Sequence, residues 1–136
     1  MHLRTDVATI GTPIVLTDDA GPVAIYPIPY LEPQLTWQQL DADSPSHSAV
    51  LQAAGDRVRA SARASGYDRT VVLAHAFVKG KFFPVRADSE RDISVGGTEM
   101  APVSVFDDIS YVALGHLHGF QEPVPGRITY SGTPLA

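Results

Sequence analysis

Two apolar runs that end on histidine constrain the fold of this chain more than any other feature. Residues 70–74 (TVVLA) are followed at once by His75, and residues 111–114 (YVAL) lead directly into residues 115–118 (GHLH). Short runs of this kind without polar alternation predict strands that are covered on both faces, as in a parallel sheet. Helices cover the faces of such sheets, so the pattern favours an α/β fold.

The N-terminal half predicts a hairpin followed by a helix. Residues 13–17 and 23–26 form the expected strands, on either side of a turn at residues 18–22 (DDAGP). Residues 27–33 contain three prolines and predict an ordered loop, since proline cannot occupy a helix interior or a central strand.

The expected helix covers residues 45–64. Ser44 is the predicted N-cap, Pro45 lies in the first turn, and Gly66 fits a C-terminal cap. Gly55 weakens the helix. An apolar stripe at four-residue spacing gives the helix a core-facing side, and it consists of Val50, Ala54, Val58 and Ala62.

The C-terminal half predicts further strands separated by irregular segments. Residues 77–100 are too long for a plain connection and suggest a functional loop. A short helical turn is expected at residues 102–107, a strand at 110–115, a loop at 119–126 and a last strand at 127–131. The resulting expectation is one α/β layer, with helices packed on a mostly buried sheet.

Composition limits the classes of protein to consider. The 136 residues suffice for one domain or part of one, and the absence of cysteine excludes disulfides and thiolate metal sites. No apolar stretch approaches the ~18 residues of a membrane span, and the N-terminus lacks a signal-peptide pattern. We therefore expect a cytoplasmic protein without membrane contact. The net charge of -5 counts against DNA binding through a basic surface, but not against a metal-centred nuclease.

The three histidines suggest a metal site. Ligands of α/β sheets gather at the carboxyl ends of the strands, where His75 and His116 are expected. Imidazole binds Zn, Mn and Fe. Residues two apart on extended backbone project about 6.6 Å apart, whereas paired catalytic metals lie about 3.5–4 Å apart, so His116 and His118 can each bind a different metal of a pair.

Other interpretations stay open for these residues. His75 also fits a hydrogen-bonded core histidine, and the His116–Leu117–His118 sequence fits a polar surface loop. Residues 131–134 (SGTP) suggest either a close approach of Gly132 to substrate phosphate or an ordinary turn. Residues 88–91 (DSER) suggest a substrate or partner contact or a solvated loop.

Several segments together resemble one family. The segments that carry the resemblance are residues 23–33, 72–78 (VLAHAFV), 88–97 (DSERDISVGG), 111–118 (YVALGHLH) and 130–135 (YSGTPL). They are similar to the SbcD subunits of bacterial SbcCD exonucleases, within the calcineurin-like metallophosphoesterases. The Gly-His-x-His element marks the superfamily, and the Ser-Glu-Arg and Tyr-Ser-Gly-x-Pro elements narrow it to SbcD.

The resemblance implies a four-layer α/β sandwich with a dinuclear, usually Mn²⁺-dependent site. It implies phosphodiester hydrolysis at DNA ends and on hairpins in DNA repair and recombination, with the SbcC ATPase as partner. Carried over to this chain, His75 and His116 would bind one metal and His118 the other. The metals would polarise the phosphate and lower the pKa of a bound water.

The chain lacks the family's upstream Asp-x-His, bridging-Asp and Gly-Asn-His-Asp motifs. Residues 1–136 are therefore expected to be the C-terminal part of the nuclease domain, truncated at both ends. We expect a partial sandwich that is inactive alone and forms a homo-oligomer through exposed sheet surface. Two alternatives are a metallophosphoesterase that acts on small phosphate esters and a non-catalytic binding or assembly module.

Overall fold

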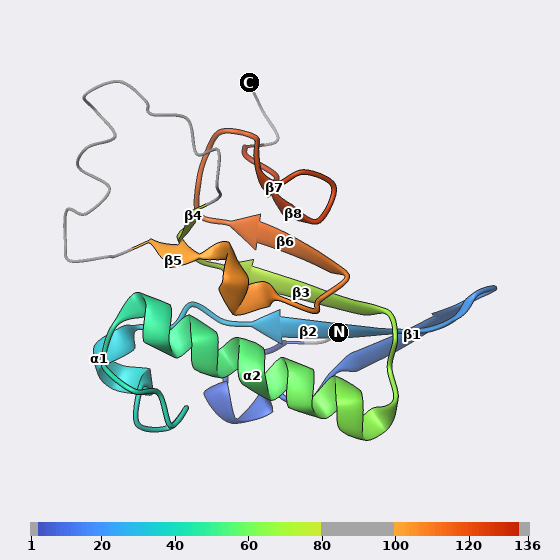
Figure 1. The fold of residues 1–136 in the computed structure, drawn as a ribbon, viewed down its shortest axis with the longest axis horizontal. Coiled ribbons are helices and arrows are strands. Elements are labelled where there is room, and N and C mark those ends of the chain that lie inside the picture. The colour runs from blue at the N-terminus through green and yellow to red at the C-terminus, as the bar shows by residue number, and fades with distance from the viewer. Residues whose placement is uncertain (1–2, 80–99, 134–136) are drawn as a thin grey trace.

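A six-stranded mixed sheet forms the centre of the molecule, in the order β1-β2-β3-β6-β8-β7 (Figure 1). The computed structural model describes residues 3–79 and 100–133. The inner strands run parallel, and β1 and β7 pair antiparallel at the two edges. The strands are β1 (Ile14–Asp18), β2 (Gly21–Ile28), β3 (Thr70–His75), β6 (Tyr111–Gly115), β7 (Gln121–Val124) and β8 (Ile128–Tyr130). The expected α/β class is confirmed, and the sheet is consistent with a partial α/β sandwich.

Helix α2 (His47–Ser65) packs on the sheet and bears out the predicted apolar stripe, all of which is buried. The predicted start was wrong: Ser46 is the N-cap, not Ser44, and its hydroxyl oxygen accepts a hydrogen bond from the backbone N–H of Ala49 at 3.2 Å. Both serines precede the helix, and only Ser46 stands at the correct spacing from a free N–H of the first turn. Gly66 ends the helix with a left-handed φ of 72°, as predicted.

Smaller elements complete the description. They are η1 (Val7–Thr9) and η3 (Val103–Phe106), both 3-10 helices, the short helix α1 (Pro33–Thr36), and a small parallel pair of strands, β4 (Val78–Lys79) and β5 (Ala101–Pro102). η3 confirms the helical turn expected at residues 102–107. The predicted long loop was wrong at residues 78–79, which form β4, and its residues 80–99 lie outside the described part of the chain. The described helices include none that is long and apolar enough to span a membrane.

The two proline-containing segments predicted as loops contain strands. β2 continues through Pro27 to Ile28. Its pairing with β1 ends at Ile25, so Pro27 and Ile28 pair with β3 alone. β7 lies within the expected loop 119–126 and includes Pro123 at the outer edge of the sheet. In both places one side of the strand has no hydrogen-bonded neighbour among the described strands, which is the position where a sheet tolerates proline.

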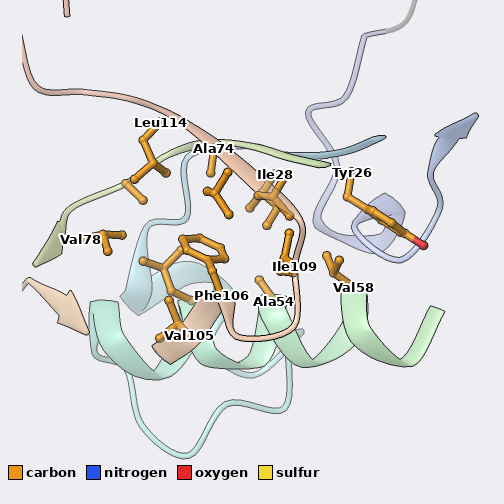
Figure 2. Close-up of a cluster of buried hydrophobic side chains, with 14 of the residues drawn as sticks. Tyr26, Ile28, Ala54, Val58, Ala74, Val78, Val105, Phe106, Ile109 and Leu114 are labelled. Carbon is orange, nitrogen blue, oxygen red and sulfur yellow. The ribbon is translucent and has the colours of Figure 1, made fainter. Parts of the chain in front are cut away.

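The core lies between the sheet, α2 and η3 (Figure 2). Gly55 of α2 permits this packing, since a Cβ atom there would lie 2.1 Å from the carbonyl oxygen of Val105. The same oxygen accepts a hydrogen bond of 2.9 Å from the Arg59 guanidinium, which also donates to the carbonyl of Asp107 at 3.0 Å. Gly55 lowers the helix propensity of α2, but it allows η3 to pack closely against the helix.

The other face of the sheet is only partly covered by the described residues, contrary to the expectation of two covered faces. Burial alternates along β3: Val72 and Ala74 face α2 and are buried, whereas Leu73 is 43% exposed. On β6, Tyr111 lies opposite Val71 and is 37% exposed. An apolar run indicates that a strand can be covered on both sides, but it does not indicate which segment does so. We call the half-exposed side, with Leu73 and Tyr111, the open face.

An ion pair joins the β1–β2 hairpin to the start of β3. The Arg69 guanidinium donates to both carboxylate oxygens of Asp18, each at 2.6 Å. These hydrogen bonds lower the pKa of Asp18 to about 2. Paired, parallel hydrogen bonds of this kind fix geometry as well as charge, so the exposed hairpin has a defined orientation relative to the parallel strands.

Candidate metal centre

The register of the sheet brings two of the predicted histidines together. β3 and β6 are parallel neighbours, with His75 opposite Gly115, so that His116 follows directly beside His75. At the other end of these strands, the hydroxyls of Thr70 and Ser110 each accept a hydrogen bond of 3.1 Å from the backbone N–H of the other residue. This reciprocal pair fixes the register from which the histidine positions follow.

The imidazoles of His75 and His116 contact each other directly. Nε2 of His75 lies 2.9 Å from Nδ1 of His116, and the ring planes are nearly perpendicular at 86°. One of these nitrogens carries the proton of the hydrogen bond and the other accepts it, so the contact requires at least one neutral ring. When both rings are neutral, the ring that donates keeps a lone pair on its other nitrogen, at the carboxyl edge of the sheet.

The environment of His116 favours its neutral form. Burial lowers the pKa of the His116 imidazole, and the nearby imidazoles of His75 and His118 lower it further. Metals bind the neutral form of imidazole, and protons compete with them for the nitrogen. The site thus keeps His116 in the state that a ligand needs at neutral pH.

His116 is also held in a backbone conformation that few residues adopt. Its φ is 104°, in the region that favours glycine. The ring of Phe77 packs against its imidazole, with centroids 3.7 Å apart and planes at 80°. Strained backbone of this type persists where the surroundings determine it, and it is concentrated at functional sites.

Gly115 leaves room for the pair. A Cβ atom at this position would lie 3.3 Å from Nδ1 of His75, closer than most such contacts in proteins. The ring of His75 also meets Tyr30 edge-on, with centroids 6.0 Å apart. His75 therefore lies between Tyr30, Gly115 and the His116 ring, and its orientation is restricted from several sides.

The third predicted ligand, His118, lies near this pair but outside the direct contact of the two rings. It is exposed, and its backbone carbonyl accepts hydrogen bonds from the backbone N–H and the hydroxyl of Thr133, at 2.9 and 3.3 Å. Across the described ranges, 3–79 and 100–133, no three His, Asp or Glu side chains form a group suited to a metal ion. The structure thus brings together two of the three predicted ligands and keeps the third nearby.

The close approach of Gly132 in the structure is to the chain itself, and the approach to phosphate stays a prediction. Its φ is 71°, and a Cβ atom would lie 2.8 Å from the backbone nitrogen of Phe120 and 3.0 Å from the carbonyl oxygen of His118. Gly132 and Thr133 therefore support the segment that carries His118. The expected role for residues 88–91 concerns a segment outside the described part of the chain.

Sequence reasoning missed the residues that support the pair. Phe77 and Tyr30 contact the two rings, and His47 and Tyr130 bind the backbone around Phe77. Phe77 stands two positions after His75, and this spacing is a local signal for its role. His47 gave no such signal, because its contact joins residues 30 positions apart in the chain.

The comparisons with known proteins agree with the motif resemblance. The chain is 33% identical over 130 residues to the SbcD subunit of the SbcCD nuclease of Rhodobacter capsulatus. The match takes in 90% of this chain and 32% of that protein, so the chain spans about a third of the length of this curated relative. No family model matches the chain. The similarity supports a relationship to SbcD for the region that aligns.

Proposed function

We propose that the chain is part of an SbcD-like nuclease subunit and contributes His75 and His116 to its metal centre. The observation that carries this proposal is the direct contact of the two imidazoles at the carboxyl edge of parallel strands. The similarity to a subunit of an SbcCD nuclease along most of the chain supports it. The proposed reaction of the whole protein is metal-dependent phosphodiester hydrolysis at DNA ends and hairpins.

The two imidazoles fit a shared metal ion after a small movement. Nε2 of His75 and Nδ1 of His116 would hold the ion, which requires both nitrogens to be free of protons. In the observed contact of 2.9 Å the two nitrogens share a proton, so binding an ion would displace this proton and separate the two nitrogens. Such an ion, when bound, supplies polarisation of the phosphate and a lower pKa for a bound water.

The donor set of the described residues limits what the chain does alone. Mn²⁺ prefers carboxylate oxygen ligands alongside imidazole, and the described part of the chain places no third His, Asp or Glu side chain with His75 and His116. We therefore propose that the chain binds Mn²⁺ weakly and is not a competent nuclease by itself. We assign His118 to a second ion, on the resemblance alone.

Calorimetric titration of the purified chain with Mn²⁺ tests the metal centre. We expect weak binding that His116→Asn abolishes, whereas His118→Asn leaves the first ion bound. Normal folding with no uptake of metal would instead favour a non-catalytic binding or assembly module. Mn²⁺-dependent degradation of duplex DNA by the chain, lost in His116→Ala, would contradict the proposed inactivity.

The substrate class and partner of the complete protein are proposed from similarity. Hydrolysis of duplex ends and hairpins in preference to nucleotides distinguishes the nuclease from a phosphoesterase of small phosphate esters. We also propose the SbcC ATPase as partner, which co-purification of the two chains after co-expression tests. An active enzyme that prefers nucleotides and ignores DNA ends would replace the nuclease assignment.

A further inference from the structure

The segment that follows His75 is held by side chains from distant elements. The hydroxyl of Tyr130, on β8, donates to the carbonyl of Ala76 and accepts from the backbone N–H of Val78 at 2.7 Å. Between them, the backbone N–H of Phe77 donates to Nε2 of His47 at 3.0 Å. Three consecutive residues are thus bound through their backbone by two buried side chains.

His47 is the first residue of α2 and is almost wholly buried, with 2% exposure. Because its Nε2 accepts a hydrogen bond, that nitrogen is unprotonated and the ring proton is on Nδ1. The ring also meets the ring of Phe77 edge-on, with centroids 6.4 Å apart. His47 therefore contacts both the backbone and the side chain of Phe77.

Phe77 in turn packs against His116, the ligand candidate with the strained backbone. A continuous path of contacts runs from His47 through Phe77 to His116 and His75. If the Phe77 backbone shifts, its ring no longer restricts the His116 imidazole at the same place. The first turn of α2 is in this way connected to the histidine pair through a residue that touches both.

We propose that His47 is a positioning residue for the His75–His116 pair, acting through the backbone and ring of Phe77. The proposal rests on the proposed function only in taking this pair as the metal centre. The simpler alternative is that His47 fills the core and satisfies one backbone N–H, with no effect on the pair. The two roles differ in what a change at position 47 does to the His116 ring.

The proposal is tested by substitutions of His47 that distinguish its role as a hydrogen-bond acceptor from the space that its side chain fills. His47→Gln places an amide oxygen near the position of Nε2, whereas His47→Leu fills a similar space without an acceptor. Val58→Ala, at a fully buried position of the same helix, is the matched control for lost stability. The readout is the imidazole ¹H–¹⁵N NMR spectrum of the metal-free chain, together with the melting temperature.

We expect His47→Leu and Val58→Ala both to lower the melting temperature. Only His47→Leu should shift the His116 and His75 imidazole signals, and His47→Gln should keep them near their wild-type positions. Unchanged signals in His47→Leu, or equal shifts in Val58→Ala, would overturn the proposal. If His47→Leu does not fold, His47→Phe keeps an aromatic ring at position 47 without the acceptor nitrogen; unchanged His116 signals in that variant would overturn the proposal equally.

Metal titration separates this inference from the proposed function. Residues that orient a ligand from behind typically change metal affinity by about 10-fold or more. We expect His47→Leu to weaken Mn²⁺ binding by about this factor relative to His47→Gln. A wild-type chain that takes up no Mn²⁺ would contradict the proposed function, while the NMR comparison still decides the role of His47.

Discussion

Nδ1 of His116 and Nε2 of His75 lie 2.9 Å apart, although 41 positions separate the two residues in the chain. The parallel register of β3 and β6 brings them together, and the backbone of His116 departs from ordinary geometry at this point. This departure gives the clearest measurable signature of the site. It predicts that the best side chain for stability at position 116 differs from the best one for binding.

His116→Gly should be more stable than His116→Ala. Glycine adopts a φ near 104° without strain, whereas a side chain with a Cβ atom costs about 1 kcal/mol or more there. Urea unfolding of the two variants measures the difference. Both lack the imidazole, so loss of the contact with His75 cancels. Greater stability of His116→Ala would show that the backbone at this position is not strained.

Gly55→Ala should destabilise the chain, although alanine is the better helix former. The added methyl group would lie 2.1 Å from the carbonyl oxygen of Val105, so η3 has to move away from α2. Overpacking of this kind costs about 1–3 kcal/mol. Thermal or urea unfolding gives the sign, and a gain of about 1 kcal/mol, as propensity alone predicts, would contradict the close packing.

The ion pair between Asp18 and Arg69 should give the stability a specific pH dependence. The pKa of Asp18 is lowered from 3.8 to about 2 in the folded chain, so folding is favoured while the carboxylate is charged. This contribution is complete above the unfolded pKa and is lost as the pH falls from about 4 to 2. The stability difference between wild type and Asp18→Asn should therefore shrink over this range. A difference that stays constant would contradict the lowered pKa.

The open face should promote self-association. Leu73 and Tyr111 expose apolar surface on a sheet whose edge strand β1 has one side unpaired among the described strands, and both features favour contact with another chain. We expect oligomers by light scattering at tens of micromolar, reduced by Leu73→Glu. Leu35→Glu is the control, since Leu35 is 76% exposed on α1. A monomeric wild-type chain would contradict this prediction.

The sequence predicted the elements whose signals are local. The hairpin, the parallel strands β3 and β6 and the stripe of α2 follow from apolar periodicity, and Gly66 follows from its conformational freedom. Proline misled the prediction at Pro27, because its effect depends on whether the strand has a neighbour on that side. Which sides of a strand have a neighbour is determined only when the sheet is assembled.

The residues of the candidate site also fall into those that the sequence predicted and those that it did not. His75 and His116 were predictable because His75 ends β3, His116 directly follows β6, and parallel strands end at one edge. The contacts of Phe77 with His47 and of Val78 with Tyr130 were not, because they join segments that only packing brings together. The contact of Gly132 and Thr133 with the backbone of His118 was not predictable either, because no spacing rule describes it.

The alternation along β3 has a consequence for the accessibility of His75. Leu73 and His75 share one side of the strand, and Val72 and Ala74 share the side that packs on α2. Shifting the strand by one residue exchanges these sides, so it would drive the imidazole into the core and expose alanine. The alternation of sides that leaves Leu73 half-exposed therefore also leaves His75 accessible to solutes. The register of β3 determines both exposures together.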